Sequence, residues 1–188
     1  RWPKRVVMAN NSRFVNVGRL QLDKPILFSF NGRQYKGFVG DTLASALLAN
    51  GVSLVGRSHK YHRPRGIMSA GLEETNAFVQ LAGEEDEPNR LATTLPIYEG
   101  LIAHSVNAKP SVIFDVYSLL GFFSRLLPAG FYYKTFMWPR DKWDWYGRQI
   151  RKIAGWGTAP VKPARGRYEH RHHHCDILVV GAGPAGLA

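Results

Sequence analysis

The sequence PILFSFNGRQYKGFVGDTLASALLANGV, residues 25–52, decides the fold of the chain. Apolar residues alternate with others between Ile26 and Phe30, Asn31-Gly32 follows directly, and a second run ends at Phe38. Asn-Gly between two such runs is the strongest short-range signal for a β-hairpin, because both central residues of a type I′ turn need a positive φ. The first half of the segment therefore predicts two antiparallel strands.

The second half of the segment predicts a helix. Asp41 stands where an N-cap side chain can accept backbone N–H groups, and Asn50-Gly51 suits a helix end with glycine in the left-handed conformation. One face of this helix is apolar, with Leu43, Ala44, Leu47 and Leu48. Further strand-like runs follow at Val52–Val55, at Asn76–Leu81 and within 91–102, and residues 83–90 read as an acidic turn. Together these signals predict a small α+β unit in which the helix packs across a sheet.

The chain is strongly basic, with a formal net charge of +11 from 25 Lys and Arg against 14 Asp and Glu. Such a balance permits binding to nucleic acid, to anionic lipid or to an acidic protein partner. Basic charge without a groove-reading element does not indicate nucleic-acid binding, so no nucleic-acid partner is predicted. The loop GRSHKYHRPRG, residues 56–66, is either a solvated loop or a contact for a cofactor phosphate or an acidic partner; its charged side chains are Arg57, His59, Lys60, His62, Arg63 and Arg65.

Cysteine usage and hydropathy restrict the class of protein. Cys175 is the one cysteine of the sequence, which excludes an internal disulfide and a thiolate-bound cluster and fits a reducing, cytoplasmic environment. No apolar run reaches the roughly 20 residues that span a bilayer, so no membrane partner is predicted. The run His170, His172, His173, His174 and Cys175 resembles a metal site, but consecutive histidines converge poorly on one ion, and a polar linker is the preferred interpretation; no metal site is predicted.

An aromatic-rich stretch follows the α+β unit, between Lys109 and about Tyr146. Proline and glycine at positions 128, 130, 139, 147 and 155 are expected to prevent long helices there. Dense exposed aromatics usually mark an interface. We expect a docking surface for a neighbouring domain or subunit rather than an autonomous domain; the alternative is a local core against the α+β unit.

The end of the chain carries its most informative motif, CDILVVGAGPAGLA, residues 175–188. The apolar run Ile177–Val180 predicts a parallel strand buried on both faces, and it leads directly into GxGxxG. In a dinucleotide-binding fold, Gly181 permits the tight turn, Gly183 lets the backbone approach a pyrophosphate, and Gly186 lets the next helix pack on the strand. A glycine-rich turn of another α/β domain is the alternative. Because the sequence starts at Arg1 without Met and stops at Ala188 within a predicted helix, we expect a fragment that alone binds neither NAD nor FAD.

Four segments together resemble the alpha subunits of heterotetrameric sarcosine oxidases: GDTLASALLANGV, GRSHKYHRPRGI, PAGFYYKTFMWP and HCDILVVGAGPAGLA. The resemblance implies an N-terminal fragment with four parts: an arm over residues 1–24, a β-grasp [2Fe-2S] ferredoxin-like domain over 25–105, an aromatic docking segment and linker over 106–174, and the start of an FAD/NAD(P)-binding Rossmann-type domain over 175–188. Plant-type clusters need cysteine thiolates, usually four, and residues 56–81 contain none. The implied domain is therefore expected to have lost its cluster.

The same resemblance implies an activity and partners for the intact protein. NAD, or FAD as the alternative, would bind at Gly181, Gly183 and Gly186, while a beta subunit would hold flavin and oxidise the amine. Sarcosine would be demethylated to glycine, with peroxide formation and one-carbon transfer to tetrahydrofolate or release of formaldehyde, in a complex with beta, gamma and delta subunits. No catalytic residue is assigned to this chain. A subunit of a related opine, amino-acid or cyanide-forming amine dehydrogenase is the alternative, and a non-catalytic basic binding module is the hypothesis from another class.

Overall fold

The computed structural model describes residues 20–83, 87–122, 138–154, 157, 159, 169–181 and 183–187. The predicted arm over residues 1–24 lies largely outside these ranges, but its last residues belong to the first strand, which begins at Gln21. The strands are β1 Gln21–Phe30, β2 Arg33–Val39, β3 Gly56–Arg57, β4 Pro64–Arg65, β5 Phe78–Ala82, β6 Arg90–Leu91 and β7 Ile102–Ser105. The helices are α1 Leu43–Ala49, η1 Val116–Gly121, η3 Arg140–Lys142, α3 Trp143–Ala154 and α4 Pro184–Leu187.

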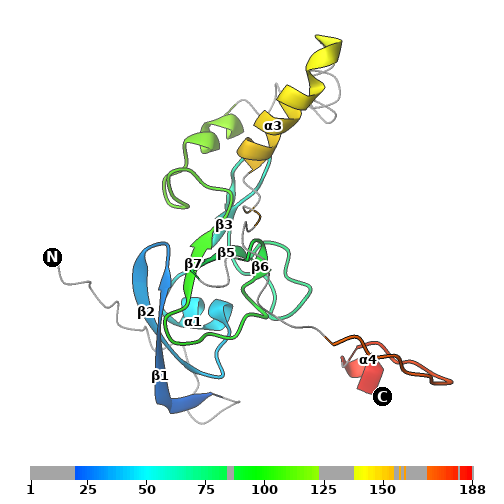
Figure 1. The fold of residues 1–188 in the computed structure, drawn as a ribbon. Helices are drawn as coiled ribbons and strands as arrows, with labels where there is room; N and C mark the ends of the chain where they lie inside the picture. Colours follow the sequence, from blue (N-terminus) through cyan, green and yellow to red (C-terminus); the bar gives the residue numbers. More distant parts are fainter. Residues whose placement is uncertain are drawn as a thin grey trace.

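The predicted hairpin is confirmed and forms one side of a five-stranded mixed sheet in the order β2-β1-β7-β5-β6 (Figure 1). Asn31 and Gly32 both have positive φ, of 50° and 76°, which the tight turn requires. β1 pairs antiparallel with β2 and parallel with β7, so that Ser29 lies opposite Ile102. The side chain of Asn31 also accepts the backbone N–H of Ser105 at 2.8 Å, which fixes the turn to the end of β7.

Helix α1 forms where the sequence predicts it, but its N-cap is Thr42 and not Asp41. Thr42 and Ser45 form a reciprocal capping box, in which each side chain accepts the backbone N–H of the other residue. Asp41 instead accepts the backbone N–H of Phe38 at 3.0 Å and the hydroxyl of Ser45 at 2.7 Å, so it closes the turn between β2 and α1. Gly51 follows the C-cap with a φ of 75°, as predicted.

The core lies between α1 and the sheet. The helix contributes Leu43, Ala46 and Leu47, each fully buried, while Leu48 on its other side is 45% exposed. Alternate residues of each strand face the helix, because side chains along a strand point to opposite faces. The buried apolar cluster contains Phe28, Phe30, Tyr35, Leu43, Ala44, Ala46, Leu47, Val55, Ala77, Val79, Leu81, Ala92, Leu95, Ile97, Leu101 and Ala103.

Three strand predictions downstream of α1 need correction. Val52–Val55 forms no strand, although Val55 is buried in the core. The strand predicted at Asn76–Leu81 is real but begins two residues later, as β5. The run predicted within 91–102 is mostly turn, flanked by the two-residue β6 and by β7. Residues 84–86 of the predicted acidic turn lie outside the described residues.

Beyond the sheet, the described part of the aromatic stretch consists of η1, η3 and α3. Gly147 was expected to interrupt helices, but it lies inside the twelve-residue α3, because one glycine lowers helix stability by only about 1 kcal/mol. Residues 123–137, which hold much of the aromatic block, lie outside the described residues. Among the residues that the structure describes, no helix is both long and apolar enough to cross a membrane.

Candidate functional site

The basic loop 56–66 is a small two-stranded unit built around a buried contact between His62 and Asp115, and not simply a solvated loop. β3 and β4 pair antiparallel, with Gly56 opposite Arg65. Between them, His62 is 1% exposed, and its Nδ1 lies 2.6 Å from the carboxylate of the equally buried Asp115. That carboxylate also accepts the backbone N–H groups of Lys109 and Tyr117. Asp115 therefore joins the basic loop to the segment after β7.

Arg57 makes the second connection between these two segments. Its guanidinium donates to the backbone carbonyls of Val112 at 2.8 Å, His62 at 2.9 Å and Ile113 at 3.1 Å. The carbonyl of Arg57 in turn accepts from the side-chain amide of Asn107 at 2.6 Å. Arg57 is thus used to hold the fold together, so part of the loop's basic charge serves structure and not ligand binding.

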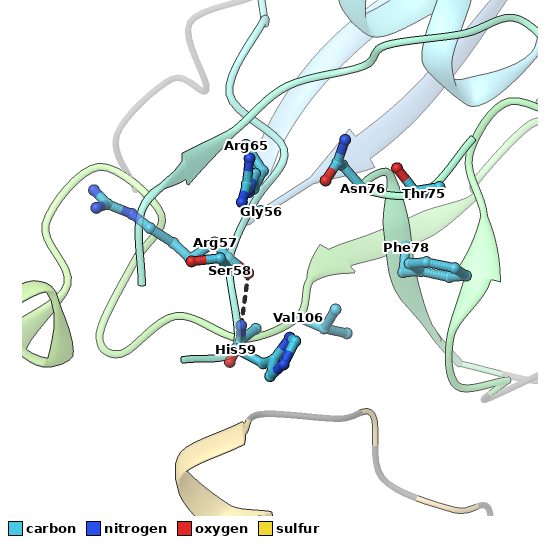
Figure 2. A pocket seen from close by; sticks show the side chains of 10 residues that line it. Gly56, Arg57, Ser58, His59, Arg65, Thr75, Asn76, Phe78 and Val106 are labelled. Atoms are coloured by element: carbon cyan, nitrogen blue, oxygen red, sulfur yellow. Dashed lines mark hydrogen bonds between the residues drawn. The ribbon is translucent and has the colours of Figure 1, made fainter. Parts of the chain in front are cut away.

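A cavity of about 240 Å³ lies beside β3, between the basic loop and the strands β5 and β7. Figure 2 shows the Arg57 side chain extending away from Asn76 and Phe78, which line the opposite wall. The cationic side chains left on this cavity are His59 and Arg65, both exposed and without an ion pair among the described residues. Ser58, Thr75, Asn76 and Asn107 add hydroxyl and amide groups to a lining that is otherwise mostly apolar and includes Phe78 and Val106. The polar groups of this cavity therefore stand in a mainly apolar wall.

The loop from Met68 to Ala77 is organised by one carboxylate. Glu74 is 3% exposed, and its two oxygens accept the backbone N–H groups of Met68 at 2.6 Å, Ser69 at 2.7 Å and Asn76 at 2.7 Å. Burial alone would raise the pKa of Glu74, but hydrogen bonds from the backbone of Ser69, Asn76, Met68 and Ala77 outweigh it and hold the pKa below its ordinary value of 4.5. The stability that Glu74 contributes is therefore present above pH 4.5 and is lost as the pH falls through the lowered pKa.

The three fingerprint glycines lie close together, Gly181 and Gly183 before the short helix α4 and Gly186 within it, although the strand expected before them is not formed. Ile177–Val180 has no strand structure in the described chain, and each of these side chains is at least 62% exposed. A parallel strand needs hydrogen-bonded neighbours, and no described strand pairs with this run. Only the four-residue helix α4 follows the turn.

Two of these glycines, Gly181 and Gly186, have a local steric reason in the described structure, while the dinucleotide role of all three stays a prediction. Gly181 has a φ of 121°, which favours glycine, and the space around a Cβ on Gly183 is open. A Cβ on Gly186 would overlap the carbonyl oxygen of Gly181, so only glycine fits there without a shift of the backbone. The N–H of Gly186 donates to the carbonyl of Gly183 at 3.0 Å. The arrangement leaves the backbone of Gly183 accessible to a ligand.

No metal centre is formed by the described residues. The histidine run before Cys175 is exposed and irregular, and among the described residues no group of three His, Cys, Asp or Glu side chains converges. The polar-linker interpretation of residues 169–174 agrees with their exposure. The sequence pattern missed Glu74 and Asp115 and assigned His62 only to the basic loop, because their roles depend on contacts between segments and not on a local motif.

Comparison with protein families finds a match to the first half of the chain. Residues 23–108 match the family described as "2Fe-2S iron-sulfur cluster binding domain", and the observed mixed sheet lies almost wholly within this range. The residues of this range cannot bind such a cluster through cysteine thiolates, since the one cysteine of the sequence, Cys175, lies outside it.

Comparison with individual proteins confirms the resemblance predicted from the four motifs. The chain is 53% identical over 173 residues to "Sarcosine oxidase subunit alpha" of Rhizobium meliloti (strain 1021), covering 91% of this chain and 18% of that protein. It is 31% identical over 174 residues to the protein of the same name from Corynebacterium sp. (strain U-96), covering 90% of this chain and 13% of that one. The chain therefore spans less than a fifth of the length of these relatives.

Among solved structures, the chain is similar to L-proline dehydrogenase from P. horikoshii, with a TM-score of 0.36 and 21% sequence identity. The similarity covers 43% of this chain and 15% of that one.

Proposed function

We propose that this chain is part of the alpha subunit of a sarcosine oxidase-type complex that demethylates sarcosine to glycine. The supporting observation is the 53% identity over 91% of the chain to an alpha subunit of that name. Beta, gamma and delta subunits are the proposed partners, with flavin chemistry in the beta subunit. Peroxide and formaldehyde are the proposed products, or a one-carbon unit carried by tetrahydrofolate. The described residues supply a scaffold and binding surfaces to this complex.

Isolation of the native complex by an affinity tag on this protein tests the proposal. The purified complex should consume oxygen and release peroxide when sarcosine is added, with glycine as a product. Opines, proline and glycine should be tested as substrates in parallel, since a related opine, amino-acid or cyanide-forming amine dehydrogenase is the second candidate. Turnover of one of these with none of sarcosine would reject the proposal in favour of that candidate.

A non-catalytic basic binding module is the candidate from another class, and the cavity beside β3 favours it specifically. Arg65 and His59 stand at that cavity among hydroxyl and amide groups. Replacing both side chains with alanine separates the candidates. In an oxidoreductase subunit, sarcosine turnover by the complex should survive this change, whereas binding to an anionic partner should be lost if the module's charge is its function.

The glycine turn is proposed to bind a dinucleotide, NAD or alternatively FAD, in the longer protein. The Gly186→Ala substitution is expected to weaken this binding by roughly tenfold or more, equivalent to about 1.4 kcal/mol. The reason is the overlap between the new Cβ and the Gly181 carbonyl, which forces the turn open. Titration of the complex with NAD, together with its FAD content, measures the effect.

Gly147→Ala is the matched control for this substitution. A Cβ on Gly147 meets no atom within 4 Å, so the control should leave nucleotide binding unchanged. Equal nucleotide affinity in the Gly186→Ala complex and in the unsubstituted complex would argue against a dinucleotide role for this turn.

The aromatic segment is proposed to be a docking surface for another part of the longer protein or for a neighbouring subunit. Trp143 and Trp145 on α3 are 52% and 51% exposed, and Trp138 before the helix is 80% exposed. The Trp143→Ser/Trp145→Ser variant is expected to lose copurification with the partner subunits, because each buried ring contributes about 2 kcal/mol to an interface. The thermal unfolding midpoint of the isolated chain should change little.

Leu72→Ser provides the control, because Leu72 is 85% exposed and lies on the loop that Glu74 organises. This variant should copurify normally. A double tryptophan variant that also assembles normally, or one whose isolated chain unfolds at a clearly lower temperature, would favour a local core over docking.

A further inference from the structure

Three positions in the loop before β5 have the spacing of cluster ligands. Plant-type [2Fe-2S] sites bind through cysteines with four and then two residues between them, and a fourth cysteine comes from farther along the chain. Ser69, Glu74 and Ala77 have this spacing, within the range that matches the iron–sulfur domain family. None of the three is a cysteine, so the loop retains the spacing without the thiolates.

The contacts of the loop show what stands at its centre. The carboxylate of Glu74 accepts three backbone N–H groups, from Met68, Ser69 and Asn76, at 2.6–2.7 Å. The hydroxyl oxygen of Ser69 is buried without a hydrogen-bond partner in the described structure. An anion inside a ring of inward-pointing backbone N–H groups is the arrangement that an iron–sulfur cluster, with its negatively charged sulfurs, also requires.

A fourth position comes from the turn after β6. Thr93 is 4% exposed, and its hydroxyl donates to the carbonyl of Gly71 in the same loop at 2.8 Å. The neighbouring Ala92 donates its N–H to the carbonyl of Ala77 at 2.9 Å. Thr93 therefore stands against the loop from a distant part of the chain, as the fourth ligand of a plant-type site does.

We propose that the carboxylate of Glu74 occupies the place of a [2Fe-2S] cluster and replaces it as the anion that orders the loop, with Ser69, Ala77 and Thr93 at the other ligand positions. An iron–sulfur cluster links distant segments through its ligands and accepts hydrogen bonds from backbone N–H groups. In this chain Glu74 accepts those hydrogen bonds, and the hydrogen bond between Thr93 and Gly71 links the two segments. The domain is thereby ordered without carrying electrons.

The first test compares Glu74→Gln with Glu73→Gln in the full 188-residue chain. Glutamine at position 74 turns an NH₂ group toward backbone donors and leaves at least one N–H unpaired, whereas Glu73 is exposed. Glu74→Gln should raise the equilibrium constant for unfolding by roughly 10- to 100-fold and should speed amide exchange at Ser69 and Asn76. Glu73→Gln should do neither. Unchanged exchange at both amides in a folded Glu74→Gln chain overturns the proposal.

The second test restores the thiolates and does not depend on the stability of the first variant. In a Cys175→Ser background, the substitutions Ser69→Cys, Glu74→Cys, Ala77→Cys and Thr93→Cys are combined, and the denatured chain is refolded anaerobically with iron and sulfide. Visible charge-transfer absorption with equal amounts of iron and labile sulfide is the expected result. The three-cysteine variant that keeps Glu74 should give none, because the carboxylate fills the site. Absence of a cluster in the four-cysteine chain, or an equal cluster yield in the three-cysteine chain, contradicts the proposal.

Discussion

Replacement of Asp115 with alanine is expected to lower the free energy of unfolding by about 3–5 kcal/mol, because three groups lose their acceptor and a buried donor left unpaired costs about 1–3 kcal/mol. The change removes the acceptor for His62 Nδ1 and for the backbone N–H groups of Lys109 and Tyr117. All of these groups lie in the connection between the basic loop and the segment after β7. Urea unfolding followed by circular dichroism measures the loss.

A double-mutant cycle separates the pair from its surroundings. His62→Gln is combined with Asp115→Ala, and Asp141→Ala serves as the exposed control, with an expected effect within about 0.5 kcal/mol. Contact between the two side chains predicts a coupling energy of about 0.5–3 kcal/mol. Strict additivity of the two single changes would show that the His62–Asp115 contact, at 2.6 Å in the structure, does not stabilise the fold.

The second large effect is expected at Leu47 in α1. Leu47→Ala should lower the free energy of unfolding by about 2–5 kcal/mol, because it removes buried methyl groups and leaves a cavity against the sheet. Leu47 is fully buried in the cluster that contains Phe28 and Val79. Urea unfolding of the Leu47→Ala chain and of the unsubstituted chain, at a single temperature, measures the difference in the free energy of unfolding.

The neighbouring Leu48 provides a matched control with the same chemistry in the same helix. It is 45% exposed, so Leu48→Ala should change the free energy of unfolding by no more than about 0.5 kcal/mol. If Leu47→Ala and Leu48→Ala lowered the free energy of unfolding by similar amounts, the helix would pack on the sheet with a different face from the one described. A large loss for Leu48 alone would require the helix to be rotated.

The features that the sequence predicted well are those fixed by neighbouring residues. Asn31-Gly32 encodes its turn because two adjacent residues adopt positive φ, and Gly51 ends α1 for the same local reason. The assignment of Asp41 as N-cap was wrong because its carboxylate finds a nearer partner in the backbone of Phe38, which leaves the cap to Thr42. The choice between two adjacent cap-forming residues depends on how the preceding strand ends.

The features that the sequence did not predict depend on residues far apart in the chain. His62 was assigned to a basic loop, yet its ring is buried because Asp115, 53 residues later, lies beside it. The apolar run Ile177–Val180 predicts a buried strand, but hydrophobicity specifies burial only where a sheet exists to cover it. The dinucleotide role of the three glycines, read from their spacing, stays a prediction, whereas the Glu74 carboxylate at the centre of its loop could not be predicted from any local motif.

The parallel pairing of β1 with β7 also bears on how the domain is made during synthesis. The middle of the sheet joins Ser29 to Ile102, so the two central strands are separated by almost the whole domain sequence. Topologies dominated by such distant contacts fold slowly, since a long loop must close before the contacts form. The β1–β2 hairpin leaves the ribosome before β7 and has an unpaired β1 edge until β7 emerges. During that interval the nascent chain presents an open strand edge, on which another strand can pair.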